Sequence, residues 1–310
     1  MDKRRPFRFG VQAAGVASRD EWVARAYRVE ALGYDILLLP DHFGVQYAPF
    51  PALAVAAEAT IDLRVGTFVN AVDFHHPAML AKEAATLDTL SQGRFELGLG
   101  AGWLKDEYDA AGLAFEAPGT RIDRLAEALT IVKGLFGPDP VNFAGAHYRV
   151  ANLTGSPRPA QDPRLPILVG GGGRRLLTLG AREADIVSIN PRARRAGGLD
   201  RADIAREAVV EKAGWVREAA GLRWADLELN ITIVGAAVTD APRAALAPFV
   251  ARYGLSEETL LASPHLLIGS VDGIVASLQE ARERWGISYA TVPERHMQEL
   301  APVVARLRGR

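Results

Sequence analysis

The chain has 310 residues, 49% of them hydrophobic and 24% charged, which is a globular composition with enough length for one large core. Its formal net charge of −1 excludes a general electrostatic attraction to nucleic acid or anionic membranes, and the absence of cysteine excludes disulfides, thiolate metal ligands and cysteine nucleophiles. No segment approaches the roughly 18 apolar residues of a membrane span, and residues 1–9 lack the apolar run of a signal peptide, so we expect a soluble, cytoplasmic protein.

Apolar segments of strand length alternate with longer amphipathic segments in the first half of the chain. Gly33 is placed to end the first amphipathic segment and Pro77 to begin another, because glycine and proline favour these two helix ends. The expected strands are 7–12, 35–40, 63–69 and 95–100, and the expected helices are 20–32, 51–60, 77–90 and 121–136.

Residues 137–166 interrupt this alternation because they are rich in proline and glycine. We expect an irregular insertion there, with a short hairpin at 143–150, after which the alternation resumes. The remaining expected strands are 166–170, 185–189, one within 227–238, and 288–292. The remaining expected helices are 174–183, 200–220, helices between 242 and 262, 271–285 and a last helix ending near 308.

Eight strands that alternate with helices predict parallel pairing with right-handed crossovers. The number of strands and the chain length favour a (β/α)8 TIM barrel, a closed α/β fold formed by residues 1–310 as a single domain, over an open doubly wound sheet. Active sites on this barrel lie at the carboxyl ends of the strands. The residues that follow each strand are therefore the candidate site.

The second strand ends in an acid and an imidazole, in the sequence ILLLPDHF at 36–43. On a barrel, Asp41 and His42 would lie at the mouth, where side chains can reach a ligand. The simpler interpretation is a helix-capping aspartate next to a surface histidine.

The fifth strand ends in four consecutive glycines, Gly170, Gly171, Gly172 and Gly173, followed by Arg174 and a helix. Glycines let the backbone approach a ligand closely, and a helix N-terminus attracts anions, so this pattern predicts a phosphate site. It matches neither the nucleotide P-loop nor the dinucleotide fingerprint. A tight strand-to-helix turn without a ligand is the alternative.

The fourth strand ends in GLGAGWLKDEY, at 98–108. Gly100 and Gly102 would clear space at the mouth, and Trp103 could form a wall for a flat ring. The glycines could also serve only to relieve crowding inside the barrel. The residues expected to line a substrate pocket are Gln12, Trp103 and Tyr108.

Two further strand ends carry polar residues that point less specifically to a function. Adjacent His75 and His76 suggest a metal site, but neighbouring residues rarely point at one ion. We therefore expect no metal and place both histidines before the helix at Pro77. The run 192–195 contains three arginines that could bind an acidic group, although a solvated charge run explains them equally well.

Taken together, these segments resemble the luciferase-like flavin and deazaflavin oxidoreductase superfamily, over nearly the whole chain. The resemblance lies in their order and spacing. The segments are GYDILLLPDHF at 33–43, HPAMLAKEAATLD at 76–88, GRFELGLGAGW at 93–103, LPILVGGGG at 165–173, AREAD at 181–185 and WGISY at 285–289.

The resemblance implies a barrel that binds one flavin or deazaflavin ring at its mouth. Asp41 and His42 would lie beside the ring and the substrate, with His42 as general acid or base and Asp41 either orienting it or binding the cofactor. Residues Phe68, Val69 and Asn70 would lie behind the ring, and relatives often carry a non-proline cis peptide at the position of Phe68–Val69. The glycines at 170–173 with Arg174 would hold the cofactor phosphate, and the arginines at 192–195 its acidic tail.

The segments FGVQ at 9–12 and PDHF at 40–43 look most like members that use coenzyme F420, a deazaflavin that transfers hydride. This implies an F420-dependent oxidoreductase acting on an enone, imine or alcohol, and relatives of this type often form homodimers. Trp103 stands where sugar-phosphate dehydrogenases of the superfamily carry glutamate, which speaks against a sugar phosphate. The alternatives are a reduced-FMN monooxygenase, a non-catalytic flavin-binding protein and a phosphosugar barrel enzyme without a redox cofactor.

Overall fold

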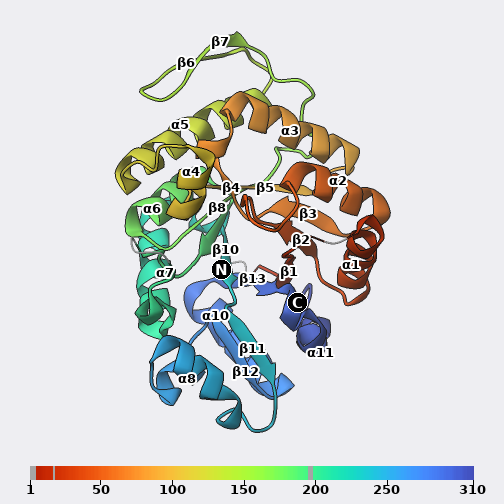
Figure 1. The fold of residues 1–310 in the computed structure, drawn as a ribbon, viewed down its shortest axis with the longest axis vertical. Coiled ribbons are helices and arrows are strands. Elements are labelled where there is room, and N and C mark those ends of the chain that lie inside the picture. The colour runs from red at the N-terminus through yellow and green to blue at the C-terminus, as the bar shows by residue number, and fades with distance from the viewer. Residues whose placement is uncertain (1–4, 17, 195–197) are drawn as a thin grey trace. The chain divides into compact units, whose positions relative to one another are not determined.

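The computed structural model of the chain describes residues 5–16, 18–194 and 198–310 (Figure 1). Within these residues the chain divides into two compact units. Unit 1 comprises the described residues of Met1–Ala13, Tyr27–Leu37 and Gly170–Arg310, and unit 2 comprises those of Ala14–Ala26 and Leu38–Val169. The elements α1 (Arg19–Ala31), β2 (Ile36–Leu39) and β8 (Ile167–Gly171) each contribute residues to both units.

Unit 2 contains parallel strands followed by helices. Its strand β5 pairs in parallel with β3, with β4 and with the first three residues of β8. Each of its three longer helices begins with proline, which has no backbone N–H to leave unpaired in a first turn. The strands are β3 (Arg64–Thr67), β4 (Asn70–Ala71) and β5 (Phe95–Gly100), and the helices are α2 (Pro49–Ala59), η1 (Val72–Phe74), α3 (Pro77–Leu90), α4 (Lys105–Ala111) and α5 (Pro118–Phe136).

The predicted hairpin in the insertion is present in unit 2. Strands β6 (Val141–Ala144) and β7 (Arg149–Leu153) pair antiparallel and extend away from α3 and α5 (Figure 1). The carboxylate of Glu127 on α5 accepts hydrogen bonds from three successive backbone N–H groups of the hairpin turn, at Ala146, His147 and Tyr148. This helix therefore fixes where the hairpin begins its turn.

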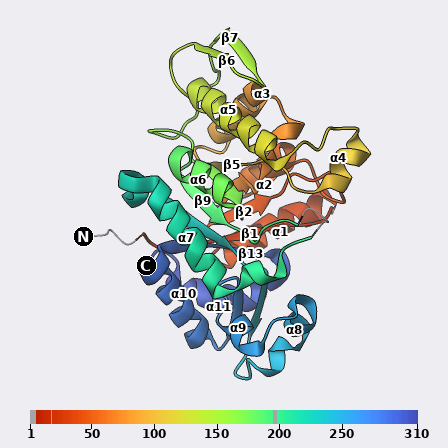
Figure 2. The same ribbon diagram turned by 90° about the vertical axis from the view of Figure 1, so that its left-hand side faces the viewer.

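Unit 1 is built on four parallel strands in the order β1-β13-β10-β9. Helices α6 and α7 pack side by side in it (Figure 2). The strands are β1 (Arg8–Gln12), β9 (Ile186–Ile189), β10 (Glu228–Thr232) and β13 (Ile287–Pro293). The helices are α6 (Arg174–Glu183), η2 (Arg201–Ile204), α7 (Arg206–Ala220), η3 (Gly221–Ala225), α10 (Val271–Trp285), η5 (Glu294–His296) and α11 (Met297–Leu307).

The prediction of a single strand within 227–238 is wrong, because this segment holds two strands. Strand β10 ends at Thr232, and residues Gly235–Val238 form a separate strand, β11, which pairs in parallel with β12 (Leu266–Gly269) in a small sheet of its own. The apolar side chains of α8 (Ala247–Tyr253), α9 (Glu257–Leu261) and η4 (Ala244–Leu246) pack with this sheet in a satellite core. The sequence shows only one apolar run here because two buried strands adjoin.

Candidate active site

The end of β2 places His42 beside a carboxylate from a distant part of unit 2. His42 Nδ1 lies 2.8 Å from Glu107 Oε2 on α4, and both side chains are partly buried. On its other side, the His42 ring meets the ring of Trp103 edge to face, with centroids 6.0 Å apart. His42 is thus held by a carboxylate and an aromatic ring that both belong to residues 103–107.

Asp41, the neighbour of His42, is bound to the segment that follows β4. Its Oδ2 lies 2.8 Å from His75 Nε2 and accepts a hydrogen bond from the backbone N–H of Ala71. Burial opposes protonation of His75, but the hydrogen bond and charge of Asp41, with a contribution from Glu83, outweigh it and raise the pKa of His75. The sequence offered Asp41 as a partner that orients His42; in the structure Glu107 bonds His42 and Asp41 bonds His75.

A third hydrogen bond links the segments that carry these partners. Tyr108, next to Glu107 and buried, donates its hydroxyl to Asp73 Oδ2 at 2.9 Å. Burial and the Asp73 carboxylate raise the pKa of Tyr108. The pairs His42–Glu107, Tyr108–Asp73 and His75–Asp41 therefore join three short segments in a closed circuit, which we call the histidine–carboxylate ring.

The peptide bond Phe68–Val69, between β3 and β4, is cis, at the position that the sequence singled out. The glycines of β5 make room for this turn. A Cβ at Gly98 would lie 2.1 Å from the carbonyl oxygen of Thr67, and one at Gly100 would lie 2.5 Å from Val69 Cγ2. The next residue, Asn70, is buried, and its Oδ1 has no hydrogen-bond partner within the described part of the chain.

Gly102 and Tyr108 fit each other closely. Gly102 has a φ of +68°, and a Cβ there would lie 1.7 Å from the Tyr108 hydroxyl oxygen. The Tyr108 ring also packs against Phe74 and Phe115. The Tyr108 hydroxyl is therefore committed to Asp73, while Trp103, with 40% of its surface exposed, remains accessible; a substrate contact of either residue stays a prediction.

In unit 1, the four glycines form the end of β8 and the start of α6. A Cβ at Gly171 would lie 2.3 Å from the Leu176 side chain, and one at Gly172 would lie 2.6 Å from both the Asn190 carbonyl oxygen and the Arg192 nitrogen. Gly173 is the N-cap of α6, lacks any capping side chain and has open space around its Cβ position. Gly173 offers no side chain to cap the first turn of α6, and the N-terminus of a helix attracts an anion.

A buried ion pair holds the segment that packs on this loop. Lys212 on α7 donates to the Asp203 carboxylate and to the carbonyl oxygen of Asn190, and Asp203 also accepts from the backbone N–H of Arg192. Asn190 in turn donates its backbone N–H to Gly171. The Arg192 side chain pairs with Asp203, so it is not a freely solvated charge, and Arg195 lies outside the described residues.

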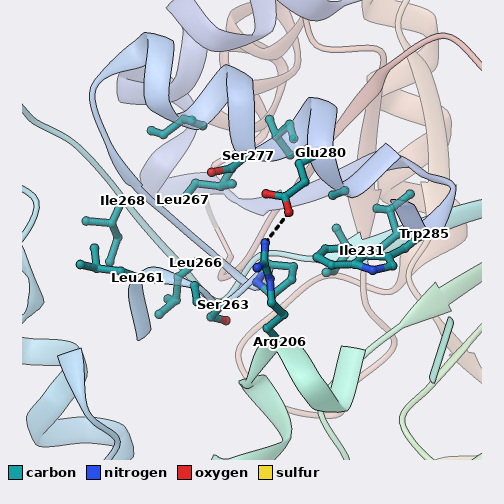
Figure 3. Close-up of a pocket in the computed structure, with 16 residues that line it drawn as sticks. Arg206, Ile231, Leu261, Ser263, Leu266, Leu267, Ile268, Ser277, Glu280 and Trp285 are labelled. Carbon is teal, nitrogen blue, oxygen red and sulfur yellow. Dashed lines mark hydrogen bonds and ion pairs between the residues drawn. The ribbon is translucent and has the colours of Figure 1, made fainter. Parts of the chain in front are cut away.

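Several further sites can be judged from the described residues. Gln12 ends β1 and is half-buried. Figure 3 shows a separate pocket in unit 1, where Arg206 forms an ion pair with Glu280 over the indole of Trp285; none of the residues predicted for the site lines it. Within residues 5–16, 18–194 and 198–310, no group of three side chains could hold a metal ion, and no helix is long and apolar enough to cross a membrane.

Sequence reasoning missed Asp73, His75 and Glu107 as partners in this site. Asp73 and His75 stand after the third strand, and Glu107 stands after the fourth, so their positions at strand ends were the available signal. The expectation that His75 only flanks the start of α3 did not foresee its bond to Asp41. His76 does take that role, because its Nδ1 accepts from the Ala78 backbone N–H and caps α3.

Comparisons with known proteins agree with this architecture. The luciferase-like monooxygenase family matches residues 6–253. The chain is 34% identical over 175 residues to an F420-dependent glucose-6-phosphate dehydrogenase of Intrasporangium calvum, covering 53% of this chain and 52% of that protein. It is 32% identical over 174 residues to an F420-dependent hydroxymycolic acid dehydrogenase of Mycobacterium tuberculosis, covering 54% and 48%. The matches span about half the length of these relatives.

Solved structures show the fold. A coenzyme F420-dependent tetrahydromethanopterin reductase from Methanopyrus kandleri covers 98% of this chain and 100% of its own, with a TM-score of 0.75 and 17% identity. A long-chain alkane monooxygenase covers 98% and 91%, with a TM-score of 0.76 and 14% identity. The prediction of a luciferase-like (β/α)8 barrel is confirmed, and at these identities the likeness speaks for the fold alone.

Proposed function

The chain belongs to the luciferase-like monooxygenase family, and we propose that within it the chain is a coenzyme F420-dependent oxidoreductase that exchanges hydride with a small organic substrate. The observation that carries the proposal is the placement of His42. It is a partly exposed imidazole just after a strand end, bonded to a carboxylate. The names of the relatives, F420-dependent dehydrogenases, support this cofactor over FMN.

The residues present fit a deazaflavin in two respects. Asn70 Oδ1 is a buried acceptor without a partner in the described chain, beside the turn that the resemblance places behind the ring. The uncapped first turn of α6, at Gly173, suits a phosphate. The residues that we propose hold the cofactor are Asp41, Phe68, Val69, Asn70, Gly100, Gly102, Gly170, Gly171, Gly172, Gly173 and Arg174. When bound, the cofactor supplies a carbon that gives or accepts hydride.

His42 would take up or release the proton that accompanies hydride transfer, as imidazole does in many enzymes. Asp41 is engaged by the His75 imidazole and by the Ala71 backbone N–H before any ligand arrives. We assign Asp41 the role of holding the turn after β4 in the position that the deazaflavin ring of the cofactor requires.

The proposed substrate class is supported by apolar side chains close to His42 in the sequence and by Trp103, whose ring the imidazole meets. Phe43, Val45 and Trp103 are exposed and apolar. The nearby cation Lys105 forms an ion pair with Asp109 on the same helix. Such surroundings favour an uncharged carbonyl, imine or alcohol over a phosphate dianion. We therefore propose that glucose 6-phosphate, the substrate named for one relative, is not turned over, in keeping with Trp103 in place of the glutamate.

A direct titration tests the proposal. Purified protein is titrated with oxidised F420 and, in parallel, with oxidised FMN and anaerobically reduced FMN. Micromolar binding of F420 alone is expected, followed by exchange of hydride with enones, imines or alcohols. A preference for reduced FMN would instead place the chain among the monooxygenases. Tight cofactor binding by wild type without turnover, unchanged in His42→Ala, would indicate a non-catalytic binding protein. Dimer formation stays a prediction.

A further inference from the structure

We propose that Glu107 is a positioning residue that fixes one tautomer of His42, with the proton on Nδ1 and the lone pair on Nε2. The inference rests on the proposed function, because it assigns Nε2 as the atom that exchanges a proton with the substrate. The sequence and the comparisons assign no role to Glu107.

The hydrogen bond selects the tautomer. An ionised carboxylate has acceptor sites only, so the 2.8 Å contact between Glu107 Oε2 and His42 Nδ1 requires a proton on Nδ1. In neutral imidazole, the other nitrogen then carries the lone pair. The edge-to-face contact with Trp103 restricts rotation of the His42 imidazole about its side-chain bond to Cβ.

Two charged groups close to His42 and Glu107 in the chain, Asp41 and Lys105, are already engaged elsewhere. Asp41 on the same strand end is bonded to His75. On α4, Lys105 pairs with Asp109, one turn along the helix. Glu107 is thus the carboxylate of these neighbours that meets the imidazole of His42.

Glu107 is itself held by the residue that follows it. The buried Tyr108 ring and its hydroxyl bond to Asp73 anchor α4, and Asp73 accepts a further hydrogen bond from Arg124 at 2.7 Å. Arg124 continues to Glu116, before α5. Because α4 has only seven residues, this anchor rather than the helix itself determines where the Glu107 carboxylate lies.

The mechanism predicts a specific failure when the carboxylate is replaced by an amide. In Glu107→Gln, the side chain keeps its shape but can donate as well as accept, so it no longer selects one tautomer. In a catalytic triad, the equivalent change leaves the geometry intact and lowers kcat by about 10⁴-fold through the wrong tautomer. Here we expect a loss of about 10²- to 10³-fold in kcat with the dissociation constant of F420 within about threefold.

The experiment reads the tautomer directly. The ¹⁵N chemical shifts of histidine-labelled protein are recorded for wild type and for Glu107→Gln, with the His42 signals assigned from His42→Ala. Wild type should show a protonated Nδ1 and an unprotonated Nε2 at His42, and Glu107→Gln should lose this preference. Asp109→Asn is the matched control, because it removes a carboxylate from the same helix without touching His42, and it should keep the wild-type signals.

Turnover is measured with reduced F420 and cyclohex-2-enone as the probe. A wild-type protein that fails to bind F420 overturns the proposed function. A protein that binds F420 but shows the same His42 tautomer in wild type and Glu107→Gln overturns only the role of Glu107. An equal loss of kcat in Asp109→Asn and Glu107→Gln would also overturn it, since the effect would then follow charge and not the bond.

Discussion

The histidine–carboxylate ring of unit 2 and the Lys212–Asp203 pair of unit 1 are both clusters of ionisable side chains, but they differ in access to solvent. His42 and Glu107 have 28% and 13% of their side-chain surface exposed, whereas Lys212 and Asp203 have 0% and 1%. A group that exchanges protons with a ligand must be reachable. The partly exposed histidine–carboxylate ring can therefore perform chemistry. The buried Lys212–Asp203 pair, which we call the closed cluster, can only stabilise the fold.

The bonds of the two clusters match this division. In unit 2 the bonds join side chain to side chain and fix an imidazole. In unit 1 the Lys212–Asp203 pair bonds main-chain atoms at Asn190 and Arg192, which pack against Gly172. Burial lowers the pKa of Lys212, and the hydrogen bond and charge of Asp203 oppose this shift.

The largest expected effect on turnover comes from removing the His42 imidazole. If the histidine–carboxylate ring performs chemistry, His42→Ala should lower turnover by about 10²- to 10⁴-fold, because it removes the group that carries the proton. The dissociation constant of F420, measured by fluorescence, should stay within a few-fold. Wild-type turnover in this variant would remove His42 from the reaction and leave both clusters with structural roles.

The buried pair should respond in the opposite way, through stability. Lys212→Met leaves the Asp203 carboxylate buried with only the Arg192 side chain to balance it, and the free energy of unfolding should fall by about 3–5 kcal/mol. The double variant Lys212→Met with Asp203→Asn should regain part of this loss, because no unpaired charge remains. Urea unfolding measures both; a double variant no more stable than the single one would show that packing, and not charge, is what Lys212 supplies.

The sequence predicted the local parts of these clusters and not their partners. Asp41, His42 and the four glycines stand out because each follows an apolar strand directly. The partner of His42 lies 65 residues away, and a single sequence does not say which of its carboxylates reaches the imidazole. The strand break between β10 and β11 was missed for a related reason, since it depends on pairing with β12, more than 25 residues further on.

A histidine in the closed part of unit 1 gives a smaller, pH-dependent effect. His265 is fully buried beside the Thr232 carbonyl, and burial lowers its pKa to about 4. The unfolded chain protonates this imidazole near pH 6.5, and the folded chain does so only near pH 4. Acidification through this window therefore favours unfolding, by up to about 3 kcal/mol for this residue.

His265→Asn isolates that contribution, because an amide can still donate to Thr232 but does not titrate. Urea unfolding of wild type and variant is compared at pH 7 and pH 5. The variant should be less stable at both, but its loss between the two pH values should be smaller than that of wild type by about 2 kcal/mol. An equal loss in both proteins would mean that His265 is protonated in the folded state.

The smallest effect tests whether the glycine loop, which the closed cluster supports, binds phosphate at all. Gly171 is a poor place for a charge, since any side chain there would also collide with Leu176. Gly173 has an extended backbone, a φ of −92°, and open space, so it accepts a side chain without strain. Position 173 is the N-cap of α6, so either Asp or Asn there should stabilise the protein by a few tenths of a kcal/mol relative to glycine.

The two Gly173 variants should part only in phosphate binding. Gly173→Asp places a negative charge where the cofactor phosphate would sit, and it should weaken F420 about tenfold relative to Gly173→Asn, less so at high salt. A deazaflavin chromophore that lacks the phosphate should bind both variants equally. If F420 also binds both variants equally, the loop is a structural turn, and the Lys212–Asp203 pair supports a backbone that binds no ligand. If the two affinities differ, the Lys212–Asp203 pair supports the phosphate-binding loop without contacting the phosphate itself.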